Sequence, residues 1–387
     1  MKRTITITAF ALATLIFLSF VPIFGTAAEN DISFIRSEGA IPYDVSSPPP
    51  QNAARCMCVI TSDGATVYEH NADEKRGMAS TTKIMTALVA IENASPDEEF
   101  VIPAEAVGIE GSSVYLKEGE RLTLRELLFC LMLESGNDSA TAIALAIGGS
   151  VNGFVDMMNS RAREMGLTDT SFANPHGLSD NDHYTTAREL AMITAEALKH
   201  PLFRELVSTK RISVRYDGAE NGRSLVNHNK LLFGYSGAIG VKTGYTKRDG
   251  KCLVSAAERN GTVIIAVTLQ DPFPTATHRA LLDSAFAVCE QKTVAQEGEI
   301  VATVKIANAD GLYITLTNSE KVTLSLSKGA RTEITLNLPK SLNAPIEKGA
   351  SYGYATVSAN GKEVYIIHLK ATSSIKAKRK SLVDLLF

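Results

Sequence analysis

Length, composition and charge already exclude several classes of protein. A chain of 387 residues is long enough for two domains, and a content of 45% apolar and 21% charged residues is typical of a globular rather than a disordered protein. The net charge of −3 gives no indication of nucleic-acid binding, and five scattered cysteines do not indicate a disulfide framework.

The start of the chain predicts a signal peptide over residues 1–28. Lys2 and Arg3 are followed by an apolar run from about Ile5 to Phe24 and then by small residues, which are the three parts of an export signal. The alternative is an uncleaved membrane anchor, because about 20 apolar residues can span a bilayer. In both cases we expect an exported protein of the cell envelope: on the outer face of the cytoplasmic membrane, in the periplasm or outside the cell.

An irregular lead-in and a hairpin are expected next. Residues 29–52 include three consecutive prolines. Two short apolar runs between residues 56 and 68 flank Ser62-Asp63-Gly64, which is typical of a β-hairpin turn.

Residues 79–92 predict a buried helix that carries two reactive side chains. The segment has no Gly or Pro and is apolar on nearly all sides, which favours burial. Ser80 and Lys83 are three residues apart and therefore share a face. A buried lysine loses its proton more readily, and a neutral amine can accept the proton of a serine hydroxyl. The alternative is an N-capping serine with a solvated lysine, since the S-x-x-K spacing recurs at Ser325 and Ser373.

Two further buried helices are predicted around a polar turn. A Thr and a Glu at capping-box spacing begin a helix over residues 124–133, and a second apolar helix covers 139–148. Ser135 and Asn137 lie in the connection, and loops on a rigid scaffold often carry function. The alternative is a simple linking turn in which Asn137 is a local cap.

The next segments predict more helices and then a sheet. In chain order we expect helices at 151–165 and 186–198, a strand containing Lys242-Thr243-Gly244, strands at 252–257 and 262–269 joined by Asn260-Gly261, and a closing helix at 281–289. Gly244 would allow another backbone to approach its strand closely.

After residue 290 only strands are predicted. Short alternating segments with turn residues between them indicate a small β-sandwich over residues 297–372. The tail at 373–387 mixes cations with larger apolar side chains, which suggests a peripheral contact with a membrane interface; a frayed basic terminus is the alternative.

Three patterns occur together in one order: Ser80-x-x-Lys83, Ser135-Gly136-Asn137 and Lys242-Thr243-Gly244. This combination is the signature of penicillin-binding proteins and class A β-lactamases. Over about residues 50–290 the chain resembles the serine D-Ala-D-Ala carboxypeptidases, the low-molecular-mass penicillin-binding proteins of the S11 peptidase family, also at Asn174-Pro175-His176-Gly177-Leu178. The all-β appendage and the amphipathic tail fit the domain plan of that family.

The resemblance implies an α/β (α+β) fold. Residues 53–290 would form a catalytic domain of the penicillin-binding-protein/β-lactamase-like transpeptidase type, with an antiparallel sheet and a helical subdomain. A small all-β domain would follow. The substrates implied are peptidoglycan stem peptides ending in D-Ala-D-Ala, with β-lactams as inhibitors and no cofactor, metal or nucleic acid.

The resemblance also implies a role for each motif residue. Ser80 would attack the carbonyl between the two D-alanines, Lys83 would act as the general base and Ser135 would relay protons. Substrate binding would fall to the remaining positions, which are Asn137, Lys242, Thr243, Gly244 and Tyr245, with the backbone N–H groups of Ser80 and Tyr245 as the oxyanion hole.

The same residues leave three alternative functions to weigh and show one departure from the family pattern. A β-lactamase would need a base for fast deacylation, for which Glu134 is the candidate. A metallopeptidase is disfavoured because the seven histidines form no H-E-x-x-H pair. A catalytically inactive envelope-binding module would not need Ser80. Many relatives also place an arginine after the strand that follows K-T-G; here Arg279 is the nearest candidate.

Overall fold

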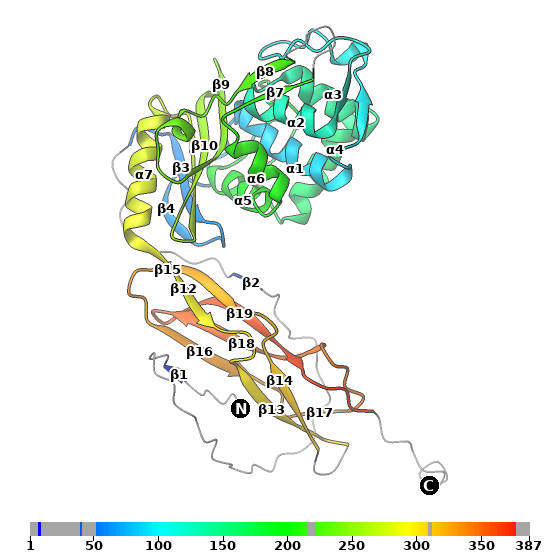
Figure 1. The fold of residues 1–387 in the computed structure, drawn as a ribbon. Helices are drawn as coiled ribbons and strands as arrows, with labels where there is room; N and C mark the ends of the chain where they lie inside the picture. Colours follow the sequence, from blue (N-terminus) through cyan, green and yellow to red (C-terminus); the bar gives the residue numbers. More distant parts are fainter. Residues whose placement is uncertain (1–6, 9–38, 41–51, 216–221, 309–311, 377–387) are drawn as a thin grey trace. The chain divides into compact units, whose positions relative to one another are not determined.

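The computed structural model describes residues 7–8, 39–40, 52–215, 222–308 and 312–376 (Figure 1). The chain divides into two compact units. Residues Asp44–Cys289 form the first, here called the α/β unit, and Glu290–Phe387 with Met1–Tyr43 form the second, the β unit. Most of the predicted signal peptide and lead-in, and residues 377–387 of the predicted tail, lie outside the described residues.

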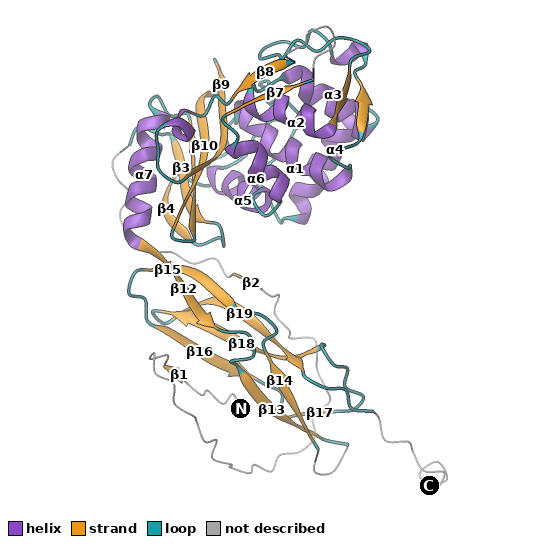
Figure 2. Cartoon of the chain, in the orientation of Figure 1, coloured by secondary structure: helices purple, strands orange, loops and turns teal. Residues whose placement is uncertain are grey.

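The α/β unit is built on a five-stranded antiparallel sheet (Figure 2). Its strand order is β4-β3-β11-β10-β9. The strands are β3 (Cys56–Thr61), β4 (Thr66–His70), β9 (Ala238–Thr246), β10 (Gly250–Arg259) and β11 (Thr262–Leu269). Every residue of the central strand β11 is buried, because α7 (Pro274–Val288) and α5 (Ala187–Ala197) both pack against it. Strand β9 is at one edge of this order, and among the described strands it pairs only with β10.

The helical part of the unit surrounds α1 (Lys83–Asn93), which is buried from Lys83 to Ala90. The other helices that pack against it are α2 (Leu124–Leu133), α3 (Asn137–Gly148), α4 (Val151–Glu164), α5 and α6 (Pro201–Ser208). Burial of these apolar surfaces supplies most of the stabilisation of such helices. Among the described residues no single helix is long and apolar enough to cross a membrane, although α3 and α4 together, bent by 84°, meet the length and composition criteria.

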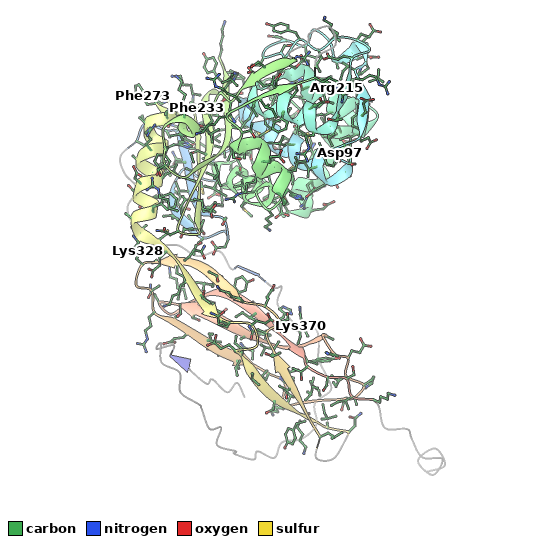
Figure 3. All side chains as sticks on the ribbon, in the orientation of Figure 1. Asp97, Arg215, Phe233, Phe273, Lys328 and Lys370 are labelled. Atoms are coloured by element: carbon green, nitrogen blue, oxygen red, sulfur yellow. The ribbon has the colours of Figure 1, made fainter. Side chains whose placement is uncertain are left out.

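Short elements connect these layers. They are β5 (Glu99–Val101), β6 (Arg121–Thr123), β7 (Arg211–Val214), β8 (Arg223–Val226) and the 3₁₀ turns Ala79–Thr82, Ala104–Ala106 and Lys230–Phe233. Arg215 follows β7 and pairs with Glu99 and Glu126, which ties the β7–β8 hairpin to β5 and α2 (Figure 3).

Three predicted helices differ from those observed. The helix predicted over 79–92 is a 3₁₀ turn followed by α1, because the hydroxyls of Thr81 and Thr82 bond back to carbonyls of the preceding residues. Helix α3 begins at Asn137 rather than Ser139. Helix α7 begins at Pro274, seven residues before the predicted start, because proline is compatible with the first turn. The capping box of α2 is confirmed at Thr123 and Glu126.

The described residues of the β unit form strands, turns and loops but no helix. The main sheet has the order β1-β16-β18-β19-β14-β13-β17, with β2 also pairing with β19, and β12 pairs with β15 in a separate two-stranded sheet. The strands are β1 (Ile7–Thr8), β2 (Gly39–Ala40), β12 (Cys289–Ala295), β13 (Val301–Ile306), β14 (Tyr313–Thr317), β15 (Val322–Ser327), β16 (Thr332–Asn337), β17 (Ser341–Leu342), β18 (Ser351–Ala359) and β19 (Lys362–Ala371). A separate apolar core lies within this unit.

Candidate active site

Ser80 lies in a turn with an unusual backbone. Ala79 has a φ of +46°, in the left-handed region that side chains other than glycine rarely adopt. The hydroxyl of Thr82 donates to the Ala79 carbonyl at 2.7 Å. Strand β9 runs close to this turn: a Cβ added to Gly244 would lie 3.0 Å from the backbone nitrogen of Ser80. The close approach expected at Gly244 therefore brings β9 directly against the serine.

Lys83 is fully buried beneath Ser80. Its Nζ lies 3.1 Å from Ser80 Oγ, 2.7 Å from Asn137 Oδ1 and 2.5 Å from the His176 carbonyl oxygen. Burial, and after it the charge of Lys242, hold the pKa of Lys83 well below its usual value, against the opposing charge of Asp138. A neutral amine has two N–H donors and one lone pair. The two carbonyl oxygens take both donors, so the lone pair is left for the Ser80 hydroxyl.

Ser135 lies in the turn between α2 and α3 with a φ of +63°. The residue is only 5% exposed, and within the described chain its Oγ has no hydrogen-bond partner. A buried hydroxyl without a partner is costly, and such groups are typical of sites that await a ligand. Gly136 beside it is restricted, because an added Cβ would lie 2.7 Å from an oxygen of Asp138.

Asn137 and Asp138 fix a loop beside the site. Asn137 Nδ2 donates to the Glu110 carbonyl at 2.5 Å, while its Oδ1 accepts from Lys83. The buried Asp138 carboxylate accepts from the backbone N–H groups of Val114 and Leu116, each at 3.1 Å. Sequence reasoning missed Asp138; the signal that could have found it is an acid directly after the Ser-Gly-Asn motif, at the start of an apolar helix.

Lys242 on β9 is 1% exposed, and its Nζ donates to the Thr243 carbonyl at 3.2 Å. Burial lowers the pKa of Lys242 to about 7, although the charge of Glu134 opposes this shift. Thr243 is half-buried and Tyr245 is exposed. Contacts from all three motifs thus meet around Ser80: Lys83 contacts Ser80 and Asn137, and Gly244 approaches the Ser80 nitrogen. The charge of Lys242 also reaches Lys83.

The segment from Asn174 to Leu178 also borders the site, because the His176 carbonyl accepts from Lys83. The Asn174 side chain accepts from the Gly177 N–H at 2.7 Å, which shapes the turn. Gly177 has a φ of +92°, and an added Cβ would lie 2.1 Å from the Ala79 carbonyl oxygen, so only glycine fits. The contribution of His176 was missed, because a backbone carbonyl that accepts from Lys83 leaves no signature in the sequence.

Two further candidates have other partners. Glu134 accepts from the Val226 N–H at 2.6 Å and lies 3.0 Å from His228 Nε2, so its carboxylate is engaged by residues at the end of β8. The Arg279 guanidinium lies 5.8 Å from the ring centre of Tyr235. Neither arrangement directs the side chain to Ser80.

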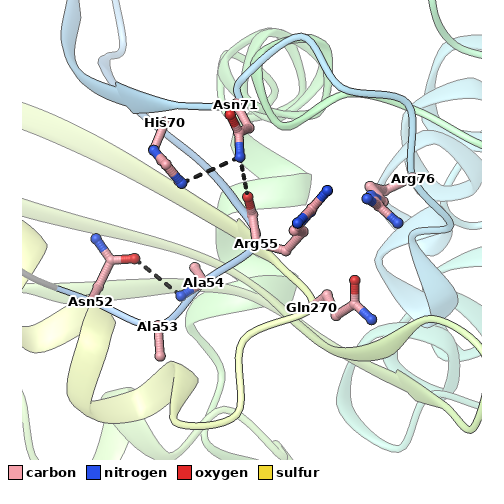
Figure 4. Close-up of a pocket in the computed structure, with 8 residues that line it drawn as sticks. All are labelled: Asn52, Ala53, Ala54, Arg55, His70, Asn71, Arg76 and Gln270. Carbon is pink, nitrogen blue, oxygen red and sulfur yellow. Dashed lines mark hydrogen bonds between the residues drawn. The ribbon is translucent and has the colours of Figure 1, made fainter.

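Pockets elsewhere in the α/β unit contain none of the predicted site residues. One of about 580 Å³ is lined by Asn52, Ala53, Ala54, Arg55, His70, Asn71, Arg76 and Gln270 (Figure 4). Both arginines of this pocket pair with Glu74, which offsets their charge. A second pocket of about 310 Å³ shares Arg76 and Gln270 and borders His183.

Comparison with known families identifies both parts of the chain. Residues 44–272 match the family model of the D-alanyl-D-alanine carboxypeptidases, peptidase family S11. The chain belongs to this family. Residues 290–377 match a second model, the C-terminal domain of penicillin-binding protein 5.

Individual relatives support the same family assignment. The chain is 32% identical over 323 residues to the D-alanyl-D-alanine carboxypeptidase DacF of Bacillus subtilis, covering 80% of this chain and 82% of that protein. It is 28% identical to DacC of Escherichia coli, covering 88% of each. The crystal structure of penicillin-binding protein 5 from Haemophilus influenzae superposes with a TM-score of 0.74 at 26% identity, over 86% of this chain and all of that one. The family and the fold class predicted from the sequence are confirmed.

Replacing Lys242 by methionine should stabilise the protein at neutral pH. The folded-state pKa of Lys242, about 7, lies below the ordinary value of 10.5, so the unfolded chain binds more protons between these two values. Stability therefore rises with pH in that interval, and the full penalty for the buried ammonium is present below it. We expect Lys242→Met to raise the free energy of unfolding in urea by on the order of 1–3 kcal/mol near neutral pH.

This gain should shrink as the pH approaches 10.5, where Lys242 is neutral in both states. Lys247→Met is the matched control, because this lysine is exposed and follows the same strand. A stability difference between Lys242→Met and the wild type that stays constant with pH would contradict the assignment.

Proposed function

We propose that the protein removes the terminal D-alanine from peptidoglycan stem peptides through an acyl-enzyme on Ser80. Ser80 Oγ attacks the carbonyl carbon of the penultimate D-alanine, the C–N bond breaks and D-alanine leaves with a proton. Water then hydrolyses the ester and restores the serine. The proposal is carried by the environment of Lys83, a buried amine with two carbonyl acceptors and Ser80 Oγ at 3.1 Å.

Lys83 is the proposed general base for this attack. Its depressed pKa supports the neutral form at the pH of catalysis, and its distance to Ser80 allows direct proton transfer. Ser135 is the proposed relay that passes the proton to the leaving amine. Its buried Oγ, without a partner among the described residues, supports this role because a substrate group would satisfy it.

Lys242 and Thr243 are the proposed binding site for the terminal carboxylate of the substrate. A lysine with a pKa near 7 carries charge in a substantial fraction of molecules at neutral pH. Asn137 would hold Lys83 through its Oδ1 and bind the substrate amide. The free edge of β9 supports an extended substrate that pairs alongside it.

The backbone N–H groups of Ser80 and Tyr245 are the proposed oxyanion hole. The close approach of Gly244 to the Ser80 nitrogen supports this pairing, because it places β9 directly against the serine turn. One oxyanion donor contributes roughly 2.7–4 kcal/mol to transition-state stabilisation in comparable enzymes.

We prefer a carboxypeptidase to a β-lactamase as the interpretation of this site. Fast deacylation needs a base that activates water, and Glu134 is held by Val226 and His228 instead. β-Lactams imitate the acyl-D-Ala-D-Ala end of the substrate, so they should acylate Ser80 and leave slowly.

Intact-protein mass after exposure to benzylpenicillin tests the proposed nucleophile. We expect the wild type to gain the mass of one penicillin and hold it while D-alanine release stops, whereas Ser80→Ala should gain none. Ser236→Ala, at an exposed serine, should behave like the wild type. An adduct that hydrolyses within seconds would support a β-lactamase, and a folded wild type without an adduct would refute the proposal.

Substitution of Glu134 tests the electrostatic role of Lys242. The Glu134 charge raises the pKa of Lys242, so Glu134→Gln should lower that pKa further while leaving an oxygen to accept from Val226. Lys242 binds the carboxylate only when protonated. The alkaline limb of kcat/KM for D-alanine release should therefore move to lower pH, by about half a unit to one unit. An unchanged or upward-shifted limb would contradict this role.

We also propose export and a peripheral membrane contact through the tail. The support is the composition of residues 1–28 and 373–387, most of which lie outside the described structure. Deleting residues 375–387 should release the processed protein from vesicles that contain anionic lipids, measured by co-sedimentation, because the tail carries four cations at 376, 378, 379 and 380. Unchanged sedimentation of the truncated protein would remove the proposal.

A further inference from the structure

His183 is a buried histidine outside the three motifs that connects two sides of the site. It is 2% exposed and comes from the loop before α5. Its Nδ1 accepts from the Ala173 N–H at 3.0 Å, and its Nε2 lies 2.7 Å from the hydroxyl of Thr82. A backbone N–H can only donate, so Nδ1 is the unprotonated nitrogen and Nε2 carries the proton. His183 therefore donates to Thr82.

The hydrogen bond continues from Thr82 to the peptide that precedes Ser80. Thr82 Oγ1 accepts from His183 and donates to the Ala79 carbonyl at 2.7 Å. The Ala79–Ser80 peptide is trans, so its C=O and N–H point in opposite directions. Fixing the carbonyl of Ala79 thus fixes the direction of the Ser80 N–H, the proposed oxyanion donor.

This peptide needs external support. Ala79 has a φ of +46°, and a non-glycine residue in this sparsely populated region persists only where the surrounding structure holds it. Gly177 also lies against this peptide, because a Cβ added to it would be 2.1 Å from the Ala79 carbonyl oxygen and 2.9 Å from the Ser80 nitrogen. Burial lowers the pKa of His183 to about 4, so the ring is neutral at neutral pH, and the hydrogen bond from the Ala173 N–H then sets its tautomer.

We infer that His183 and Thr82 are positioning residues that aim the Ser80 N–H at the developing oxyanion. Neither side chain touches the reacting atoms. The inference deepens the proposed function and rests on the role of Ser80 as nucleophile. It assigns to His183 an effect on the rate of acylation, with little effect on the initial binding of substrate or β-lactam.

Two substitutions of His183 distinguish the roles of its two ring nitrogens. In Gln the amide nitrogen can reach the position of Nε2 and donate to Thr82, whereas in Asn the shorter amide reaches only the position of Nδ1. We expect His183→Asn to slow the first-order acylation by benzylpenicillin about 10- to 100-fold, with the dissociation constant of the initial complex changed less than about threefold. His183→Gln should retain the rate to within about threefold.

Thr82→Val tests the second link with a nearly isosteric change. It should slow acylation as much as His183→Asn does, and the double variant should be no slower than either single variant, because both act through one path. This variant also decides the matter if His183→Asn does not fold.

His278 supplies the matched control for burial. It lies on α7 and is fully buried, with its two ring nitrogens hydrogen-bonded to Ser255 and Thr268 of the sheet. Among the described residues it has no hydrogen bond to the Ser80 turn. His278→Gln should lower the melting temperature and leave the acylation rate of the folded fraction unchanged.

Three results would overturn the inference: equal rates for the Asn and Gln variants, effects of Thr82→Val and His183→Asn that multiply, or changes confined to stability or initial binding. All three comparisons require a wild type that is acylated by benzylpenicillin. A wild type that forms no adduct would instead refute the proposed function itself, so the two failures are distinguishable.

Discussion

The rest of the site depends on the burial of Lys83. Its amine is completely removed from solvent, and its hydrogen-bond partners in the described chain are one hydroxyl and two carbonyl groups, with no carboxylate. An unpaired ammonium in such surroundings is strongly disfavoured, so the fold selects the neutral amine. The turn of Ser80, the start of α3 and the carbonyl of His176 must all be in place for this, which explains why residues far apart in sequence converge here.

The same region concentrates local features that oppose folding. Ala79 and Ser135 both have positive φ, the Ser135 hydroxyl is buried without a partner in the described structure, and Lys242 is buried on β9. Each costs stability, and the cost is offset by the extensive apolar core around α1. Strain and unsatisfied groups collected in one place, against a consistent background, are typical of a site under functional selection.

Sequence patterns predicted what depends on local spacing. The Thr123–Glu126 capping box predicted the start of α2, and the Ser80–Lys83 spacing predicted two neighbouring side chains, whose Oγ and Nζ atoms lie 3.1 Å apart, because both patterns are read within one helical turn. The 3₁₀ turn was missed because residues 79–82 contain no Gly or Pro that would mark a break before α1. Asp138, the carbonyl of His176 and the His183–Thr82 bond were missed for another reason: each acts on a partner more than 20 residues away, and tertiary contacts of this kind leave no periodicity.

Lys83 and Lys242 place opposite demands on one small volume. In the proposed mechanism Lys83 must be neutral to accept a proton, whereas Lys242 must be charged to bind a carboxylate. The charge of Lys242 itself favours the neutral form of Lys83. A substrate carboxylate beside Lys242 would favour its charged form, because opposite charges stabilise each other in a buried site. Binding would thereby strengthen the influence that keeps Lys83 neutral. On the proposed roles, the carboxylate that defines the substrate also helps to keep neutral the base that deprotonates Ser80, and a peptide without that carboxylate would leave less of Lys83 in the neutral form.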